Sequence, residues 1–383
     1  MKALILFLLF IIVQNNEGTL KCLVMFIRHG ARSPLKTVPA LDRLMTWPMG
    51  YGRLTPMGER QHYLLGRAFG EQYIEKEGFL SKVYNSSEFM ARSTGYERTA
   101  VSGDCFLKGF YKDNLEPLNQ NQLDNSKIWT PPLNLTDIER IKRELNTSAL
   151  PFNIPVVPIM SYDQDYDKLL EWHSCPYYET HWYTYFLSDR YKNLKNKHTE
   201  SITWVRDIFD IHFNESKLDY MFYLVDYLLT AEFHGRLKIL TDNKDILKDL
   251  AYLNTRLLVE ILTINEWMQA IALKEFARFL PEAFDNAITK NSTYKAFGLF
   301  THDMSMIQYL LGLGVKTDSK IFDDIPFTAN LVLELREKEG ENYVNAIFNG
   351  EELFREKLDE FKERLGKIKK LNGTWEEECA LRD

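Results

Sequence analysis

Runs of apolar residues of strand length and apolar positions at helical spacing follow one another in the first third of the chain. Residues 20–27 (LKCLVMFI) are almost continuously apolar, which is typical of a strand covered on both faces in an α/β sheet. Thr55 followed by Pro56 opens a helical pattern that extends to about residue 76. A short strand near 88–91 and a helix over 97–111 follow. These patterns predict a β-α-β-α arrangement.

The pattern changes at about residue 114, where Trp-, Tyr- and Leu-rich segments at helical spacing replace the strands. We expect helices over 168–172, 201–211, 218–233, 248–262 and 267–279, with Pro281 interrupting the last pattern. Strands return at 296–300, 330–335 and 343–348, and residues 336–341 indicate a hairpin between the last two. The expected fold is an α/β core of residues 19–112 and 290–383, a sheet flanked by helices in three layers. Residues 113–289 form a mainly helical insertion.

The first eighteen residues differ from the rest of the chain. Met1 and Lys2 precede an unbroken apolar run at 3–13, and residues 14–18 are polar, which is typical of a secretory signal peptide. The apolar run is too short to span a bilayer core, which needs about 20 residues. Later segments are also too polar to span. We therefore expect a protein of the lysosomal lumen or the extracellular space, with no stable membrane anchor.

Composition and charge narrow the function classes. The chain has 383 residues, with 54 acidic and 47 basic side chains and a formal net charge of −7. This composition excludes a disordered, collagen-like or disulfide-dense mini-protein. The mildly acidic balance argues against nucleic acid as the main partner, because binding to a phosphate backbone needs a basic face. If the protein binds anions, its positive charge must be concentrated locally.

Cysteines and glycosylation motifs agree with a secretory route. Cys22, Cys105, Cys175 and Cys379 lie far apart and never in a C-x-x-C pair, which argues against a metal site and permits long-range disulfides in three connectivities. Cys22, inside an apolar strand, can equally be a small buried apolar residue. Acceptor motifs for N-glycans occur at Asn85, Asn134, Asn146, Asn214, Asn291 and Asn372.

Three polar clusters follow the predicted core strands. They are Arg28–Pro34 (RHGARSP), Arg92–Thr94 (RST) and the pair His302-Asp303. Ligands of open α/β sheets bind outside the carboxyl ends of the strands, so these clusters are expected to converge. Convergence would gather three arginines, two histidines and one carboxylate around one pocket. Because the planar guanidinium group binds phosphate oxygens in pairs, the sequence predicts an oxyanion site with a reactive imidazole.

The pattern R-H-G-x-R-x-P resembles the signature of the histidine acid phosphatases, the secreted and lysosomal branch of the histidine phosphatase superfamily. Their R-S-T stretch is similar to Arg92–Thr94, with Arg98-Thr99 following, and their H-D pair is similar to His302-Asp303. Residues 54–58 (LTPMG) and 60–63 (RQHY) agree as well. The resemblance covers about 20–112 and 290–350 and implies a phosphoglycerate-mutase-like core.

The resemblance also implies roles for individual residues. His29 would attack phosphorus and form a phosphohistidine that water then hydrolyses. Asp303 would protonate the leaving alkoxide and then act as base for the water. The phosphate oxygens would be held by four residues, without a metal or cofactor: Arg28, Arg32, Arg92 and His302. Ala31 fills a variable slot in which many relatives carry Asp, which bears on substrate preference.

Two further consequences of the resemblance concern cysteines and partners. It implies a disulfide between Cys175 and Cys379 and leaves Cys22 and Cys105 undecided. The expected partner is a small phosphate monoester, and a homodimer is left open. The six remaining histidines are expected to be ordinary surface or core residues: His62, His173, His181, His198, His212 and His234. The aromatic residues at 172–185 are expected in the core, with a pocket wall for aryl or lipid phosphates as the alternative.

The favoured function is an acid phosphomonoesterase. One alternative in the same superfamily is a phytase-like enzyme, which would need a more basic pocket, and another is a lysophosphatidate phosphatase. The signal peptide argues against a cytosolic phosphomutase. The alternative from another class is a catalytically weak secreted glycoprotein that binds a phosphorylated or lipid ligand. Its usual mark would be loss of His29 or Asp303, and both residues are present.

Overall fold

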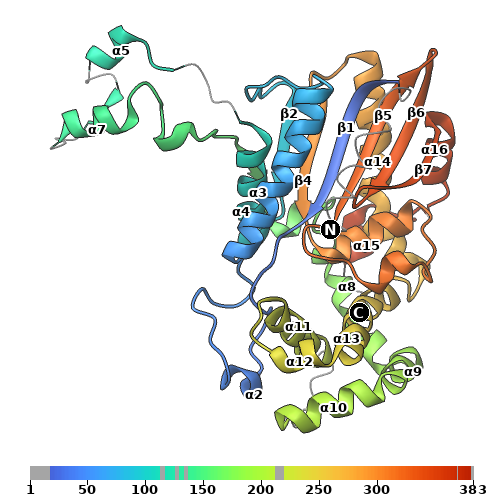
Figure 1. The fold of residues 1–383 in the computed structure, drawn as a ribbon. Coiled ribbons are helices and arrows are strands. Elements are labelled where there is room, and N and C mark those ends of the chain that lie inside the picture. Colours follow the sequence, from blue (N-terminus) through green and yellow to red (C-terminus); the bar gives the residue numbers. More distant parts are fainter. Residues whose placement is uncertain are drawn as a thin grey trace.

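A seven-stranded mixed sheet forms the centre of the larger part of the molecule (Figure 1). The computed structural model describes residues 18–112, 117–125, 129–132, 137–211, 220–368 and 370–380. Residues 1–17 of the expected signal peptide, the motifs at Asn134 and Asn214, and His212 lie outside the described residues. The strands in spatial order are β3 (Ile159–Ser161), β2 (Phe89–Ser93), β4 (Ala296–Thr301), β1 (Thr19–Arg28), β5 (Asn330–Lys338), β6 (Glu341–Phe348) and β7 (Glu351–Lys357).

The first half of the sheet is parallel, and this places the strand ends together. β1 and β2 both pair with β4 in parallel, with Arg28 opposite Thr301 and Ser93 opposite Phe300. β5, β6 and β7 add antiparallel strands at the other side of β1. The residues that follow β1, β2 and β4 therefore leave the sheet at one edge, as the sequence predicted.

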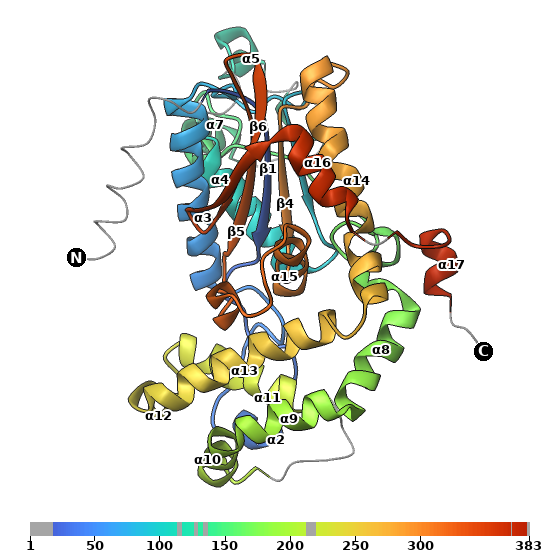
Figure 2. The same cartoon turned by 90° about the vertical axis from the view of Figure 1, so that its right-hand side faces the viewer.

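Helices cover both faces of the sheet, so the predicted three-layer α/β fold is confirmed (Figure 2). One face carries α3 (Pro56–Gly70), its π-helical continuation η1 (Glu71–Lys76) and α4 (Glu97–Phe110). The other face carries α14 (Glu266–Thr289), α15 (Asp303–Gly312) and α16 (Leu358–Gly366). β1 shows why its sequence is apolar throughout: alternate residues such as Met25 and Phe26 belong to the two separate cores on either side.

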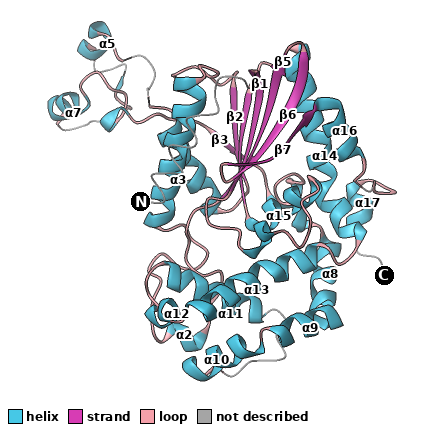
Figure 3. Cartoon of the chain, turned by 45° about the vertical axis from the view of Figure 1, so that its right-hand side comes forward, coloured by secondary structure: helices cyan, strands magenta, loops and turns pink. Residues whose placement is uncertain are grey.

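A group of helices lies beyond the carboxyl ends of β1 and β4 (Figure 3). It consists of α8 (Pro176–Leu187), α9 (Asp189–Lys197), α10 (Thr199–Phe209), α11 (Tyr220–Phe233), α12 (Lys238–Asp242) and α13 (Lys244–Leu262). The remaining short helices are α2 (Pro39–Asp42), α5 (Gln120–Asp124), α7 (Ile138–Leu145), η2 (Pro151–Asn153), η3 (Gln164–Tyr166), η4 (Trp172–Ser174), η5 (Lys320–Asp323) and α17 (Trp375–Cys379).

Several elements differ from the sequence prediction. The strand β3 and the helices α8, α9 and α16 were not predicted, and three further differences have a clear physical cause. Residues 168–172 form no α-helix, because the Asp167 carboxylate accepts the backbone N–H of Leu170 in a tight turn before η4. α14 continues through Pro281 to Thr289, since Phe276, Leu280 and Phe284 are buried on both sides of the proline. β7 was not predicted, because its sequence, EELFREK, is largely polar. This composition is possible because β7 is an edge strand of the sheet.

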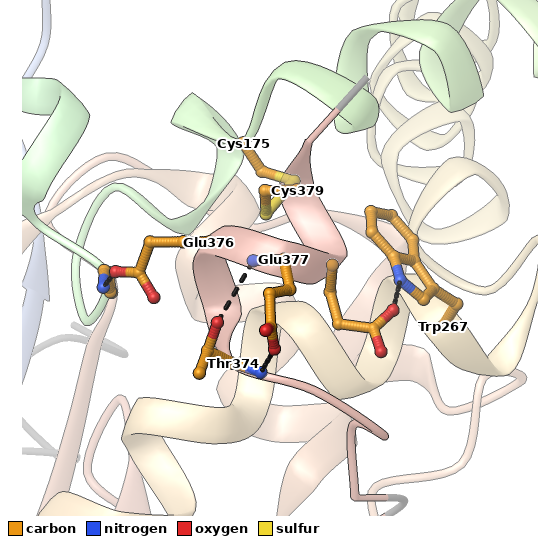
Figure 4. Close-up of a disulfide and its surroundings, with 8 residues drawn as sticks. Cys175, Trp267, Thr374, Glu376, Glu377 and Cys379 are labelled. Carbon is orange, nitrogen blue, oxygen red and sulfur yellow. Dashed lines mark hydrogen bonds and ion pairs between the residues drawn. A yellow bond between two sulfur atoms is a disulfide. The ribbon is translucent and has the colours of Figure 1, made fainter. Parts of the chain in front are cut away.

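A disulfide joins Cys175, at the start of α8, to Cys379 in α17, which is the pairing that the resemblance implies (Figure 4). α17 is closed at its N-terminus by a capping box, in which Thr374 Oγ1 accepts from Glu377 N at 3.2 Å and Glu377 Oε2 accepts from Thr374 N at 2.7 Å. Trp267 Nε1 donates to Glu378 Oε2 at 3.1 Å. The C-terminal segment is thus fastened to α8 and α14. Cys22 and Cys105 are free cysteines, and Cys22 is buried.

Candidate active site

His29 follows the last residue of β1 and is 1% exposed. Its Nδ1 lies 2.9 Å from the carbonyl oxygen of Gly30, which can only accept, so Nδ1 carries the proton and Nε2 is left with a free lone pair. Burial, followed by the charges of Arg98, Arg28 and Arg32, lowers the pKa of His29 well below its usual value. The result is a neutral imidazole with an unprotonated nitrogen at a strand end.

The loop after His29 is held in place by α3. A Cβ on Gly30 would lie 2.5 Å from the carbonyl oxygen of Gly58, so the two glycines allow an approach that no other residue permits. Gln61 Oε1 accepts from Ala31 N at 2.9 Å, and His62 Nε2 donates to the Arg28 carbonyl at 3.0 Å. Burial lowers the pKa of His62 to about 3, which keeps it neutral for this bond. The motifs at 54–58 and 60–63 therefore support the loop rather than the chemistry.

Arg28 and Arg32 each face a carboxylate. Arg28 Nη2 lies 2.6 Å from Asp303 Oδ2, and its Nη1 donates to the carbonyl of Ile325. Arg32 binds Asp226 of α11 with both Nη atoms, at 2.7 and 3.3 Å. The Nε atoms of Arg28 and Arg32 are buried without a hydrogen-bond partner in the described part of the chain. A buried guanidinium N–H without a protein partner is available to bind an anion.

Arg92, expected to hold phosphate, does not line the cavity beside His29. Its guanidinium group pairs with the buried carboxylate of Asp167 and lies over the ring of Tyr162, at 4.3 Å from the ring centroid. Successive side chains of a strand point to opposite faces of the sheet. Ala91 and Ser93 are buried, and Arg92 between them points to the other face.

Arg98 lines the cavity instead. It lies in the first turn of α4, with Nη2 at 3.4 Å from His302 Nδ1. Burial, followed by the charge of Arg32, lowers the pKa of Arg98 to about 10, so it stays cationic at neutral pH. Its Nε is also buried and has no partner among the residues placed by the structure. The available signal was Arg98-Thr99, which follows the R-S-T stretch.

His302 and Asp303 come from the turn between β4 and α15, where His302 is the N-cap residue and Asp303 begins the helix. His302 Nε2 lies 3.1 Å from Thr94 Oγ1 and 3.5 Å from Glu171 Oε1. Asp303 Oδ1 accepts from Met304 N at 2.9 Å. Burial alone would raise the pKa of Asp303, but the charges of Arg28, Arg32 and His302 lower it below its usual value. Asp303 is therefore ionised in the unliganded protein.

These groups surround a cavity of about 610 Å³ between the sheet edge and the helices α8, α11 and α13. Its polar lining includes His29, Arg32, Arg98, His302 and Asp303. Arg28 lies behind Asp303 and lines a neighbouring cavity of about 340 Å³. The rest of the lining includes an aromatic wall of six residues: Tyr51, Tyr96, Tyr178, Trp182, Phe222 and Tyr223. Of the aromatic residues between 172 and 185, Tyr178 and Trp182 line the cavity, whereas Trp172 and Tyr185 are fully buried in the core.

One further residue was missed by sequence reasoning. His173 was expected to be an ordinary surface or core histidine, but it lines the cavity. Its Nε2 lies 3.0 Å from Glu171 Oε2, so Glu171 faces two imidazoles. Nothing in the local sequence marks Glu171, because its partner His302 lies in a distant segment. Within the described ranges, no group of three or more His, Cys, Asp or Glu side chains could hold a metal ion.

A neutral histidine lies among buried arginines at the carboxyl edge of an α/β sheet, and guanidinium groups in such a place suit an anion. Comparison with known families identifies the group of proteins that share this arrangement. The family model described as "Histidine phosphatase superfamily (branch 2)" matches residues 19–349, and the chain belongs to this family.

Curated relatives match over a limited part of the chain. The lysosomal acid phosphatase of Xenopus laevis is 33% identical over 164 residues, which is 42% of this chain and 34% of that protein. The human lysosomal acid phosphatase is 35% identical over 125 residues, 32% of this chain and 28% of that protein. The human prostatic acid phosphatase is 32% identical over 131 residues, 33% of this chain and 31% of that protein. The matched part thus spans about a third of the length of these relatives.

Solved structures support the fold over almost the whole chain. The unliganded phytase of Hafnia alvei superposes with a TM-score of 0.62 at 13% identity, covering 97% of this chain and all of that one (100%). The multiple inositol polyphosphate phosphatase of Bifidobacterium longum, in complex with inositol hexasulfate, superposes with a TM-score of 0.58 at 14% identity and covers 94% of each chain. At such low identity the likeness concerns the fold alone.

Proposed function

We propose that the protein is an acid phosphomonoesterase that works through a phosphohistidine. The observation that carries the proposal is the neutral, buried His29 with a free Nε2, surrounded by Arg28, Arg32 and Arg98. Nε2 attacks phosphorus, the bond to the ester oxygen breaks, and the departing alkoxide takes the proton of Asp303. Water then attacks the phosphohistidine and gives its proton to Asp303, which releases phosphate and free His29.

Phosphate binding raises the pKa of Asp303 in this scheme. In the unliganded protein Arg28 holds the Asp303 carboxylate at 2.6 Å, and this pairing favours the ionised form. A phosphate group beside Arg28 and Arg32 neutralises these charges and adds negative charge next to the carboxylate. Both effects favour protonation of Asp303 in the complex, where the proton is needed. Substrate binding therefore protonates Asp303, which can then donate this proton to the leaving group.

The assay that tests the proposal is hydrolysis of an aryl phosphate by the purified protein between about pH 4 and 7. Release of the phenol and of inorganic phosphate at equal rates supports it. Binding of inorganic phosphate without turnover would instead favour the non-catalytic glycoprotein that binds a phosphorylated ligand.

Substitution of Arg98 is expected to lower activity, whereas substitution of Arg92 is expected to lower stability. Arg98→Gln removes a donor that lines the cavity and should lower kcat/KM by about a hundredfold. Arg92→Gln, the matched control, removes the partner of Asp167 and should mainly lower the thermal stability. Steady-state kinetics and melting curves of both variants test this. Equal losses of kcat/KM in the two variants would show that Arg92 contributes to catalysis as much as Arg98.

The pH profile should have an acidic optimum. kcat/KM requires free His29 to be neutral and free Asp303 to be protonated. Burial, followed by the arginine charges, lowers the pKa of His29, so the imidazole stays neutral well into the acidic range. The pKa of Asp303 is lowered by Arg28, so its protonated fraction falls as the pH rises through the acidic range. The maximum is expected below about pH 6; a maximum above pH 8 with no activity at pH 5 would contradict the assignment.

Small monoesters are the proposed substrates, because the charge of the site is locally balanced. Arg28 and Arg32 already face Asp303 and Asp226, and Arg53 at the cavity lies 3.9 Å from Glu97. A phytase-like enzyme, which binds a polyanion, needs more cationic side chains that are not paired with carboxylates. The aromatic wall fits the apolar part of a lysophosphatidate. Comparing kcat/KM for phenyl phosphate, lysophosphatidate and inositol hexakisphosphate separates the three. The charge balance predicts the lowest value for the hexakisphosphate.

We propose a location in the lysosomal lumen or outside the cell. The support is the apolar run at 3–13, the Cys175–Cys379 disulfide and the exposure of the four described acceptor asparagines, Asn85, Asn146, Asn291 and Asn372. Among the described residues, no helix is long and apolar enough to cross a membrane. Expression in a eukaryotic host tests the secretory route: treatment with a glycosidase should increase the electrophoretic mobility of the protein.

A homodimer is proposed at the β3 edge of the sheet. β3 is an edge strand; Met160 within it is 41% exposed, and Tyr162 directly after it is 49% exposed. Edge strands present unpaired backbone groups to a second chain. Light scattering across a concentration series tests this, and a monomer at every concentration would exclude it.

A further inference from the structure

We propose that Glu171 is a positioning residue for His302: its buried carboxylate fixes the tautomer of His302 and stabilises the imidazolium that donates to phosphate. The inference rests on the proposed function only in taking His302 as a ligand of the phosphate group. In this inference the Glu171 carboxylate neither binds the substrate nor transfers a proton; it acts through His302.

Glu171 lies between two cavity histidines. Its Oε1 is 3.5 Å from His302 Nε2, and its Oε2 is 3.0 Å from His173 Nε2. The Glu171 side chain is 1% exposed, and within the described segments these two contacts are ion-pair contacts without hydrogen-bond geometry. The contacts with His173 and His302 outweigh burial and hold the pKa of Glu171 at about 2. The carboxylate is therefore ionised, and its negative charge favours a proton on the Nε2 atom that faces it in each imidazole.

This arrangement decides what the other nitrogen of His302 can do. His302 Nε2 lies 3.1 Å from Thr94 Oγ1 and 3.5 Å from the Glu171 carboxylate, and Nδ1 of His302 faces Arg98 Nη2 at 3.4 Å. Arginine can only donate, so Nδ1 is an acceptor in the unliganded protein. When phosphate engages Arg98, Nδ1 is released and can take up a proton for a charge-assisted bond to a phosphate oxygen. The negative charge of Glu171 compensates the imidazolium that results.

Groups from four elements act on His302. They are His29 after β1, Tyr96 and Arg98 at the start of α4, Glu171 and His173 of the η4 segment, and Asp303 of α15. Burial, followed by Arg98, lowers the pKa of His302 to about 4, and Glu171 is the group that acts most strongly in the opposite direction. Loss of the Glu171 charge must therefore lower the pKa of His302 further. The imidazolium would then exist only at more acidic pH.

The segment that carries Glu171 is fastened to the element that carries His302. The carbonyl of Leu170 accepts from Thr301 Oγ1 at 3.4 Å and from Ser305 Oγ at 3.1 Å, and the carbonyl of Leu169 accepts from Tyr309 Oη at 2.6 Å. All three donors belong to β4 or α15, the elements on either side of His302. The Glu171 carboxylate and the His302 ring are therefore held in one rigid frame.

Arg92 contributes to this frame. Its guanidinium group pairs with Asp167, whose Oδ1 also accepts from Leu170 N at 2.9 Å. Asp167 O accepts from Glu171 N at 2.8 Å. The arginine that was expected to bind phosphate thus stabilises the turn that presents Glu171.

Glu171→Gln tests the inference, because it keeps the shape of the side chain and removes its charge. The affinity for inorganic phosphate is measured by calorimetry from about pH 4 to 8, with kcat/KM for an aryl phosphate in parallel. The variant should bind phosphate about tenfold more weakly at pH 5, and the decline of binding with rising pH should begin about one unit lower. Asp249→Asn is the matched control, since Asp249 pairs with another buried histidine, His198 at 2.8 Å, and neither residue lines the cavity.

The outcomes separate the two proposals. An unchanged pH dependence in Glu171→Gln, or a uniform loss of binding at all pH values with a lower melting temperature, overturns the positioning role. If the wild type hydrolyses the ester while the variant keeps the wild-type profile, only this inference fails. If the wild type binds phosphate in a Glu171-dependent way without turnover, only the phosphatase proposal fails. Absence of phosphate binding in the wild type at every pH overturns both.

Discussion

His29→Ala is expected to lower kcat/KM for an aryl phosphate by about ten-thousandfold or more, because it removes the nucleophile and no other imidazole can replace it. His302, the neighbouring imidazole, lies with its ring centroid 5.4 Å away and has its Nδ1 directed to Arg98. Initial rates at about pH 5 measure the loss. Affinity for inorganic phosphate should be largely retained, since Arg32 and Arg98 remain in the cavity.

His181→Ala is the matched control, because His181 stacks on Trp267 and does not line the cavity. It should retain wild-type kinetics. Rapid quench into alkali, in which phosphohistidine survives, should show a phosphorylated wild type and an unphosphorylated His29→Ala variant. Equal activity of wild type and His29→Ala would remove His29 from the mechanism and would favour a different nucleophile.

Asp303→Asn is expected to produce the second large effect, about a thousandfold loss of kcat on an alkyl phosphate, because the alkoxide then leaves without a proton. The loss should be much smaller for an aryl phosphate whose phenol has a low pKa, since that leaving group needs little protonation. The dependence of kcat on leaving-group pKa, measured over a series of aryl phosphates, should be steeper in the variant. This slope distinguishes loss of the acid from loss of binding.

Asp324→Asn provides the comparison for Asp303. Asp324 also acts on the charge of Arg28, but it lines the neighbouring cavity and not the one that contains His29. It should leave the leaving-group dependence unchanged. The same loss for every leaving group in Asp303→Asn would indicate that Asp303 orients Arg28, its partner at 2.6 Å, and does not supply the proton.

Local sequence patterns predicted the strands at the centre of the sheet and several of the long helices, and two of the exceptions have physical causes. The strand at β1 and the helices α3 and α4 were recognisable because burial on one or both faces imposes a period on the residues. α14 was predicted to be interrupted at Pro281, but packing of Phe276 and Phe284 outweighs the missing backbone hydrogen bond. β7 was missed because an exposed edge strand needs no apolar face.

The residues at the ends of the core strands could be identified from the chain alone. His29, Arg32, His302 and Asp303 were identifiable because an apolar run of strand length is followed directly by polar residues in the sequence. That Arg98 and not Arg92 faces the cavity is visible in the folded protein alone, since the direction of a side chain depends on the packing of α4 against the sheet. The partners Asp226 and Glu171 also came only from the tertiary structure. Each pairs with a residue more than a hundred positions away, and contacts at that separation are set by how the helices close over the sheet edge, which no local period records.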